Sequence, residues 1–318
     1  MEKIKITVLD AATLGDDIDL SLFDTIGKVT VYSLTQEADI VSRLQGQDVC
    51  ILNKIKLTAD ILKQLPNLRL ICVAATGYDN IDTDACRRLG IALCNVAGYS
   101  ANSVSQLTVA MVLSASVHLP TYRRAVSDGS YTAGGVQNIL TPVYHELAGK
   151  TWGIIGYGGI GQKVGAVAKA LGCHVLVHKR TPVEGEECVS LEELLRRSDV
   201  ITVHVPLTDQ TRSMIGKNEL AMMKKNVILI NVARGAVLDE AAVAESIEEG
   251  HIGFFGCDVY SVEPMPQTHP LYRVRDRENV CLTPHIAWGA FEARQRCMQE
   301  IEANIQAFLR EETRNRIV

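Results

Sequence analysis

Three charged residues in the last third of the chain have the types and positions needed to reduce a 2-keto acid. Arg234, Glu263 and His285 each follow an apolar run that is typical of a strand. A histidine can donate a proton to a carbonyl oxygen, and a carboxylate beside it can orient the imidazole and favour its charged form. An arginine can hold the substrate carboxylate and polarise the carbonyl. Taken singly, each residue is more often an ordinary surface or loop residue, so the prediction depends on the set.

A glycine-rich turn earlier in the chain predicts where the hydride donor binds. Segment 152–171 holds Gly156, Gly158 and Gly161 in the pattern G-x-G-x-x-G, between an apolar strand and a helical pattern. The first glycine permits a tight turn, the second lets a pyrophosphate approach the backbone, and the third lets helix and strand pack closely. The pattern alone is weak, and a glycine turn without a ligand is the alternative. Because strand, helix and next strand follow in order, we expect a nicotinamide dinucleotide site.

The next strand ends in two cations where such sites usually have an acid. An Asp or Glu at this point holds the ribose hydroxyls of NAD, but this sequence has Lys179 and then Arg180. These cations, helped by Thr181, would attract the 2′-phosphate of NADP, which arginine can bind through two hydrogen bonds. The alternative is a solvated basic turn in an enzyme that uses NAD. We therefore predict NADP(H) as the preferred cofactor, with NAD(H) as the alternative.

The elements around these residues predict an α/β fold with two doubly wound parallel sheets. In the first hundred residues, strands are expected at 4–10, 28–33, 48–52, 69–75 and 91–96, and capped helices at 58–65 and 82–90. A long helix from Ser100 to about Leu119 and a polar stretch, 127–137, precede a second series of six strand candidates. The C-terminal helix, 291–310, is expected to pack on the first domain. This predicts a substrate domain of residues 1–99 and 287–318, with a Rossmann-like cofactor domain, 100–286, inserted in it.

The composition excludes several classes of protein. The chain has 318 residues, of which 47% are hydrophobic and 22% charged, with a net charge of −5. Neither a nucleic acid nor an anionic membrane is an expected partner at that charge. The N-terminus has no signal-peptide pattern, and the nine cysteines are scattered without a C-x-x-C pair. We therefore expect a cytoplasmic protein with reduced, buried thiols and no metal site.

As a set, the motifs "GYGGIG", "NVARGAVLDE", "DVYSVEP" and "TPHIAW" resemble those of the D-isomer-specific 2-hydroxyacid dehydrogenases, in the family's order. The resemblance covers essentially the whole chain. It implies two Rossmann-like domains with a cleft between them, a homodimer, and a catalytic triad of Arg234, Glu263 and His285. Glu263 argues against the formate dehydrogenase branch, whose members lack this glutamate. The N-terminal segments "LDAATL" and "LNKIKL", with "NVAGYSANSVSQLTVAMVL", are most similar to the glycerate dehydrogenase and hydroxypyruvate (glyoxylate) reductase branch.

The same resemblance assigns further site residues. The implied substrate contacts, several of them in the loop "VAATGYDNID", are Asn53, Lys54, Ala75, Thr76, Gly77 and Trp288. The implied cofactor contacts, besides the three motif glycines and the 179–181 turn, are Gly159, Ile160, Val205, Pro206, Thr211, Val232, Ala233 and Asp258. Core packing is the alternative for Trp288. His204 is expected to be structural or to support the site from behind, and no role is predicted for His118, His145, His174, His178, His251 and His269.

Two other functions remain open at this point. A 3-phosphoglycerate dehydrogenase would need extra cations for the substrate phosphate, and Lys54 is one candidate without a cluster around it. A nucleotide-sensing protein similar to the C-terminal-binding-protein corepressors could keep the whole triad without turnover. One departure from the family pattern bears on the cofactor, because Lys179 stands where NAD-dependent members have Asp. NADP-using members of the glyoxylate and hydroxypyruvate reductase group resemble "HKRTP" here.

Overall fold

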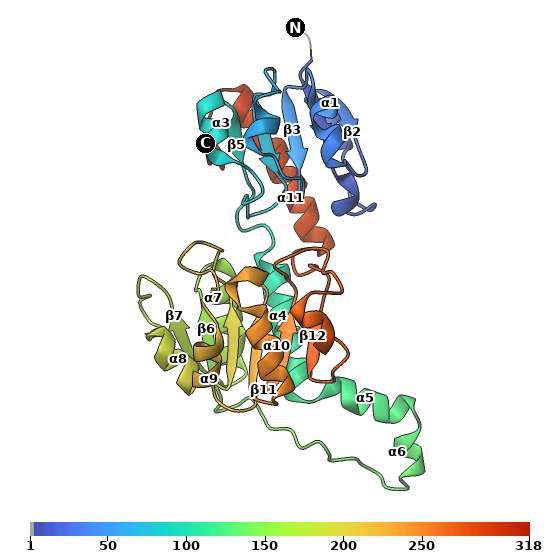
Figure 1. Cartoon of the computed structure of the whole chain (residues 1–318), viewed down its shortest axis with the longest axis vertical. Coiled ribbons are helices and arrows are strands. Elements are labelled where there is room, and N and C mark those ends of the chain that lie inside the picture. Colours follow the sequence, from blue (N-terminus) through green and yellow to red (C-terminus); the bar gives the residue numbers. More distant parts are fainter. Residues whose placement is uncertain (1–2) are drawn as a thin grey trace. The chain divides into compact units, whose positions relative to one another are not determined.

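The computed structural model describes residues 3–318, which form two compact α/β units (Figure 1). Unit 1 comprises the described residues up to Ser100 together with Gly289–Val318, and unit 2 comprises Ala101–Trp288. Each unit is built on a parallel sheet with helices beside it. The fold class is therefore the one expected, with one unit inserted in a discontinuous other.

The sheet of unit 1 is parallel and has five strands, in the order β2-β1-β3-β4-β5. Its strands are β1 (Lys5–Val8), β2 (Lys28–Val31), β3 (Val49–Leu52), β4 (Leu70–Val73) and β5 (Ala92–Cys94). Every residue of β3, β4 and β5 is buried, as expected for apolar strands covered on both faces. All five predicted strands are thus confirmed.

The helices of unit 1 are short except for the last. They are α1 (Ile40–Leu44), α2 (Ala59–Leu62), α3 (Thr83–Leu89) and α11 (Phe291–Leu309), with 3-10 helices at Ala11–Thr13, Ser21–Thr25 and Glu37–Asp39. Asp82 caps α3 by accepting a hydrogen bond from the Ala85 amide at 2.8 Å. The predicted cap at Thr58 is wrong, because its side chain makes no capping bond to the single turn of α2.

The C-terminal segment completes unit 1. Helix α11 packs on β4, and the Asn304 amide donates to the Asn95 carbonyl at 3.2 Å. Beyond the helix, Arg316 forms an antiparallel bridge with Cys94 at the end of β5. The expectation that this helix packs on the first sheet is confirmed.

Unit 2 has a parallel sheet of seven strands, in the order β12-β11-β10-β9-β6-β7-β8. The strands are β6 (Thr151–Ile155), β7 (His174–His178), β8 (Glu187–Cys188), β9 (Val200–Val203), β10 (Val227–Asn231), β11 (Ile252–Cys257) and β12 (Val280–Leu282). Six of these were expected. The seventh, β8, has only two residues and no apolar run, so the sequence pattern does not predict it.

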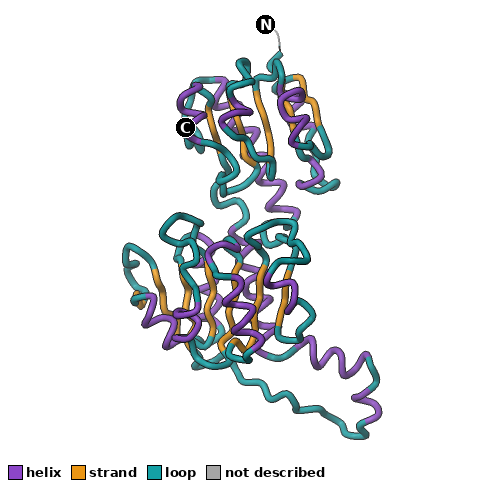
Figure 2. The backbone as a smooth tube through the Cα atoms, viewed as in Figure 1, coloured by secondary structure: helices purple, strands orange, loops and turns teal. Residues whose placement is uncertain are grey.

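Helices flank this sheet, and a core lies on each of its faces (Figure 2). The helices are α4 (Ala101–Ser116), α7 (Gly159–Ala170), α8 (Leu191–Arg197), α9 (Lys217–Met222) and α10 (Glu240–Glu248), with 3-10 helices η4 (Gly235–Val237) and η5 (Pro270–Val274). The parallel strands β6, β10, β11 and β12 all end at one edge of the sheet. The glycine turn, Arg234, Glu263 and His285 therefore follow strand ends at that edge, where open α/β sheets bind ligands.

An arm leaves the body of unit 2 after α4 (Figures 1 and 2). It consists of α5 (Leu119–Ser127), α6 (Ser130–Ala133) and an extended return to β6. The polar stretch 127–137, for which no element was predicted, contains helix α6. Among the described residues, no single helix has the length and apolarity to cross a membrane, while α4 and α5, bent by 63° at their junction, meet that test only as a pair.

Candidate active site

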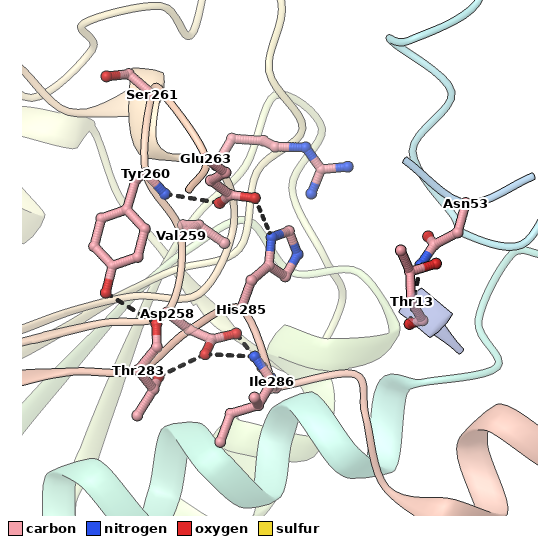
Figure 3. Close-up of polar contacts among 12 residues, drawn as sticks. Thr13, Asn53, Asp258, Val259, Tyr260, Ser261, Glu263, Thr283, His285 and Ile286 are labelled. Carbon is pink, nitrogen blue, oxygen red and sulfur yellow. Dashed lines mark hydrogen bonds and ion pairs between the residues drawn. The ribbon is translucent and has the colours of Figure 1, made fainter. Parts of the chain in front are cut away.

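The central feature of the site is a direct contact between Glu263 and His285. The Oε2 atom of Glu263 lies 2.6 Å from Nδ1 of His285, and its Oε1 atom accepts a hydrogen bond from the Tyr260 amide at 2.9 Å. Figure 3 shows the carboxylate between these two groups. The side chains are 30% and 22% exposed, so solvent reaches both. This arrangement fixes the ring plane and favours a proton on Nδ1.

His285 has an unusual backbone conformation. Its φ of 55° lies in the left-handed region, which residues other than glycine seldom adopt. Its amide donates to the carbonyl of Thr283 at 3.0 Å, closing a tight turn after β12. Such conformations persist where the surrounding structure over-determines them, and they concentrate at functional sites.

Asp258 holds the turn that carries His285. This buried carboxylate accepts hydrogen bonds from the Thr283 hydroxyl at 2.5 Å and from the Ile286 amide at 2.8 Å (Figure 3). It also accepts from the Ala287 amide at 2.8 Å. Burial raises the pKa of Asp258, and the hydrogen bonds from Thr283, Ala287 and Ile286 oppose that rise. The predicted cofactor contact is thus also a clamp on the histidine's loop.

Arg234 lies on a turn that packs against the loop of Glu263. The buried Asn231 accepts from the Ala233 amide and donates to the Arg234 carbonyl, both at 3.0 Å. A Cβ atom added to Gly235 would lie 2.1 Å from the carbonyl carbon of Tyr260, so only glycine fits there. The arginine's segment and the glutamate's loop are therefore in backbone contact.

The three motif glycines meet three different demands. Gly156 has φ +94°, and a Cβ there would lie 2.7 Å from the His204 carbonyl. A Cβ on Gly161 would lie 2.2 Å from the Gly156 oxygen, so it is needed where helix and strand cross. A Cβ on Gly158 would meet no atom within 4 Å, which leaves open space before the N-terminus of α7. This geometry fits a bound pyrophosphate.

The two predicted cations lie next to this glycine turn. Strand β7 pairs with β6, and the Gly156 amide donates to the His178 carbonyl at 2.9 Å. Lys179, Arg180 and Thr181 follow at once and are exposed. The loop they begin returns to α7, where Glu186 binds Lys169 at 2.7 Å.

Glu186 forms its ion pair with Lys169 and not with Lys179 or Arg180. Its Oε1 atom also accepts from the Tyr157 hydroxyl at 2.8 Å. Burial acts to raise the pKa of Glu186, but the hydrogen bonds from Lys169 and Tyr157 prevail and lower it. The loop after β7 is therefore anchored at one end and presents a cationic surface at the other.

The remaining cofactor candidates also lie at this edge of unit 2. Val205 and Pro206 lie in the loop after β9, and the Thr211 hydroxyl ties this loop by donating to the Pro206 carbonyl at 2.7 Å. Val232 and Ala233 follow β10, while Gly159 and Ile160 open α7. Trp288 is half-buried and packs against the core beside α4 and α7.

The substrate candidates of unit 1 occupy two neighbouring loops. Asn53 and Lys54 follow β3, and their amides donate to the buried Asp10 carboxylate at distances of 2.6 to 3.2 Å. The Asn53 side chain also donates to the Thr13 hydroxyl at 3.0 Å (Figure 3). Asn80 joins the two loops, because its side chain donates to the Ile55 carbonyl at 2.8 Å.

The second loop, Ala75 to Gly77, follows β4. The Thr76 hydroxyl donates to the Val96 carbonyl at 2.9 Å, and the Thr76 carbonyl accepts from the Asn95 side chain at 2.7 Å. Both loops are thus fixed at the carboxyl ends of adjacent strands.

Several residues that organise the site were not predicted. They are Asp10, Asn231, Gly235, Tyr260 and Thr283. A usable signal existed for Asn231, because a polar residue ending a buried strand needs hydrogen-bond partners. The other contacts join segments far apart in the sequence, so no local pattern predicts them.

A comparison with known protein families agrees with this geometry. The model for the D-isomer specific 2-hydroxyacid dehydrogenase, NAD binding domain, matches residues 109–287. The chain belongs to the D-isomer specific 2-hydroxyacid dehydrogenase family. As a member of this family it is an oxidoreductase that transfers a hydride between a nicotinamide cofactor and the CH–OH group of a 2-hydroxy acid.

Individual relatives support the assignment. The chain is 40% identical to a glycerate dehydrogenase of Methylorubrum extorquens, with 85% of each chain covered. It is 34% identical to a hydroxypyruvate reductase of Blautia hydrogenotrophica, covering 96% of this chain and 97% of that one. Among solved structures, an acyclic imino acid reductase in complex with NADPH and D-Arg superposes with a TM-score of 0.88 at 26% identity, covering 99% and 100%.

Proposed function

We propose that this 2-hydroxyacid dehydrogenase reduces hydroxypyruvate to D-glycerate or glyoxylate to glycolate, with Arg234, Glu263 and His285 as its catalytic residues. The observation that carries the proposal is the 2.6 Å contact between Glu263 and His285 at the strand edge that also holds the glycine turn. The glycerate dehydrogenase and hydroxypyruvate reductase among its relatives support the choice of substrate.

Each residue has a distinct role in this reaction. Bound nicotinamide supplies the hydride. Glu263 faces Nδ1 of His285, so Nε2 is the ring atom that gives its proton to the substrate's carbonyl oxygen. The carboxylate stabilises the imidazolium before the transfer. Arg234 binds the substrate carboxylate and stabilises negative charge that develops on the carbonyl oxygen.

The substrate contacts in unit 1 are also part of the proposal. The backbone of Ala75, Thr76 and Gly77 binds the carboxylate, and Asn53 and Lys54 contribute polar groups. Support comes from the hydrogen bonds that fix both loops at the strand ends. The half-buried Trp288 contributes one wall of the substrate pocket.

The preferred cofactor in this proposal is NADP(H). Support comes from the exposed Lys179 and Arg180 beside the glycine turn, and from the engagement of Glu186 by Lys169. The structural relative that binds NADPH has the same fold over its whole length. A 2′-phosphate would gain charge-assisted hydrogen bonds from the two cations.

The first test follows the absorbance of the reduced nicotinamide. Purified protein is mixed with hydroxypyruvate, glyoxylate or 3-phosphohydroxypyruvate, with NADPH and NADH titrated in parallel. Faster consumption of NADPH with the unphosphorylated acids is expected. A preference for the phosphorylated acid would favour the phosphoglycerate dehydrogenase alternative, and cofactor binding without turnover of any of these acids would favour the sensing protein.

A variant separates the cofactor proposal from the catalytic one. Arg180→Gln should raise KM for NADPH by about 10- to 100-fold, the value of a charge-assisted bond of roughly 1.5–3 kcal/mol, and leave KM for NADH unchanged. Lys217→Gln, which removes an exposed cation of α9, is the matched control. Equal catalytic efficiency with both cofactors in the parent enzyme would refute the NADP preference and leave the reductase intact.

We further propose that the enzyme is a homodimer in a reducing compartment such as the cytoplasm. The arm exposes large apolar side chains, among them Val126 at 65%, Leu140 at 70% and Val143 at 69%, and apolar side chains of this size are often covered at protein interfaces. All nine cysteines are free thiols, as is usual in reducing compartments. Light scattering should give twice the chain mass, and Leu140→Asp with Val143→Asp should lower it.

A further inference from the structure

A second glutamate–histidine pair lies behind the loop that carries Glu263. Glu240 is the first residue of α10, and His269 caps the 3-10 helix η5. Nε2 of His269 is 3.0 Å from Oε2 of Glu240, and the two side chains are only 3% and 7% exposed. The other oxygen of Glu240, Oε1, accepts a hydrogen bond from the Ser261 amide at 3.0 Å.

The hydrogen bonds determine the protonation state of this pair. The Leu271 amide donates to Nδ1 of His269 at 3.2 Å, so Nδ1 must present a lone pair. The ring is then neutral with its hydrogen on Nε2, and it donates that hydrogen to Glu240. The carboxylate therefore accepts from both His269 and Ser261 and keeps its negative charge, which is favoured at the N-terminus of α10.

The pair acts on the backbone that holds the catalytic glutamate. Ser261, bound by Glu240, follows Tyr260, whose amide donates to Glu263 at 2.9 Å. The Tyr260 ring meets the His269 ring edge to face at 5.9 Å, and its hydroxyl donates to the Thr283 carbonyl at 2.9 Å. Gly235 packs directly against the same peptide. The Tyr260–Ser261 segment is therefore held by Glu240, by Thr283 and by this backbone contact.

We propose that Glu240 and His269 are positioning residues of the active site, which hold the Tyr260–Ser261 segment so that the Glu263 carboxylate stays in contact with His285. They touch neither substrate nor cofactor and act through the Ser261 amide. The inference rests on the proposed roles of Glu263 and His285. It explains why a charged residue and a histidine are buried together behind a catalytic loop, where an uncharged pair would serve packing alone.

A matched pair of variants at His269 separates positioning from simple helix capping. His269→Asn keeps an acceptor for the Leu271 amide, because Asn is a good cap, but it loses the donor to Glu240. His269→Gln can place an amide donor near Glu240 but loses the cap. Glu240→Gln removes one of the two acceptors on which the contact depends, since an amide cannot accept from both partners.

Positioning predicts that the loss of the donor matters more than the loss of the cap. His269→Asn and Glu240→Gln should lower kcat by about tenfold or more, with KM for the cofactor unchanged, since small displacements of catalytic groups have large costs. His269→Gln should keep most of kcat and lose thermal stability. His174→Asn, at the exposed start of β7, is the control. The reverse ranking, with His269→Asn fully active, would overturn the proposal.

A second readout needs no turnover. Charged groups that act on His285 are Glu263, in direct contact, and the Asp258 carboxylate, while Arg234 lies on the segment packed against this loop. In ¹⁵N-histidine NMR of the apo protein, with His285 assigned by its loss in His285→Gln, the midpoint of its protonation should move to lower pH in His269→Asn. An unchanged midpoint would refute positioning. If the parent protein reduces no 2-keto acid, the proposed function fails, while this titration still tests the positioning role.

Discussion

The two glutamate–histidine pairs of unit 2 consist of the same residue types but differ in their exposure to solvent. Glu263 and His285 are 2.6 Å apart with 30% and 22% of their side chains exposed, whereas Glu240 and His269 are 3.0 Å apart with 7% and 3% exposed. In the buried pair both ring nitrogens are engaged inside the protein. In the other pair the carboxylate faces Nδ1, so Nε2 is the atom for proton transfer. Exposure and the choice of nitrogen, more than residue type, distinguish the proposed catalytic pair from the proposed positioning pair.

The backbones of the two histidines differ in the same sense. His269 has an ordinary extended conformation, with φ −66° and ψ 138°, whereas His285 has φ 55°. A left-handed conformation costs about 1–3 kcal/mol for a residue other than glycine. The Asp258 clamp on the following amides keeps His285 in this conformation. Of the two pairs, only the proposed catalytic pair therefore has a histidine with this backbone strain.

The sharpest way to break the comparison is to remove the catalytic imidazole. His285→Gln should lower kcat for reduction by about 10²- to 10⁴-fold, the usual contribution of a general acid. Binding of NADPH, followed by its fluorescence, should be unchanged. Retention of most of the activity would mean that another group donates the proton and that the two pairs do not differ in role.

Neutralising the catalytic carboxylate should have a smaller effect. Glu263→Gln leaves one of two donors, the Tyr260 amide or His285, without its acceptor and removes the charge that stabilises the imidazolium. We expect kcat near neutral pH to fall by at least about tenfold, and the pH above which reductase activity is lost to move downward. A pH–rate profile measures both. An unshifted profile with reduced amplitude would indicate that Glu263 only shapes the loop.

A substitution outside both pairs should still affect the backbone segment that connects them. Gly235→Ala places a methyl group against the Tyr260–Ser261 peptide, where a Cβ would lie 2.2 Å from the Ser261 nitrogen. Overpacking of this kind costs about 1–3 kcal/mol of the free energy of unfolding. Denaturant unfolding and kcat should fall together. Gly158→Ala is the control for stability only, because a Cβ there meets no atom within 4 Å. Gly250→Ala is unsuitable, because Gly250 has a positive φ.

His204 is a third histidine of unit 2, and unlike His269 and His285 it has no carboxylate partner among the described residues. Neither ring nitrogen of His204 has a hydrogen-bond partner among the described residues, and burial lowers its pKa from 6.5 to about 3. The unfolded chain therefore binds a proton between these pH values when the fold does not. Stability should fall as the pH drops through this window, by about 1.4 kcal/mol per pH unit.

Replacing this ring measures that contribution. His204→Phe keeps a ring of similar size and removes the titrating group, so the acid-dependent slope of the free energy of unfolding should decrease by that amount. Urea unfolding at a series of pH values from 7 to 4 provides the test. An unchanged slope would mean that His204 is protonated in the fold, and its ring would then have a charged or polar partner.

Much of the fold was predictable because its signals are local. Buried parallel strands appear as apolar runs, and the C-terminal helix has nowhere to pack except against a sheet already in place. The short β8 was not predicted, because Glu187 and Cys188 have no strand pattern in the sequence and are a strand only through their pairing with β7. The prediction of a cap at Thr58 failed, because its side chain makes no hydrogen bond to the four-residue helix α2.

The site was predictable in its main residues and not in their supports. Arg234, Glu263 and His285 lie in the loops that follow β10, β11 and β12, so their place at one edge of the sheet could be predicted from the sequence. Their supports depend on contacts between distant segments, such as the bond between Ser261 and Glu240 across 21 positions. His269 had no visible partner in the sequence, because the partner is brought to it only by the packing of α10 against η5.

The return of the chain to unit 1 has a consequence for synthesis on the ribosome. Unit 2 is a continuous segment, so all of its strands are available once Trp288 has left the exit tunnel. Unit 1 lacks α11 and the partner of β5 until residues beyond Gly289 emerge, although its five strands are made first. The sheet of unit 1 is therefore synthesised first but lacks the helix that packs on β4 until after unit 2 can fold. Nascent chains halted before α11 should be the ones that depend most on chaperones.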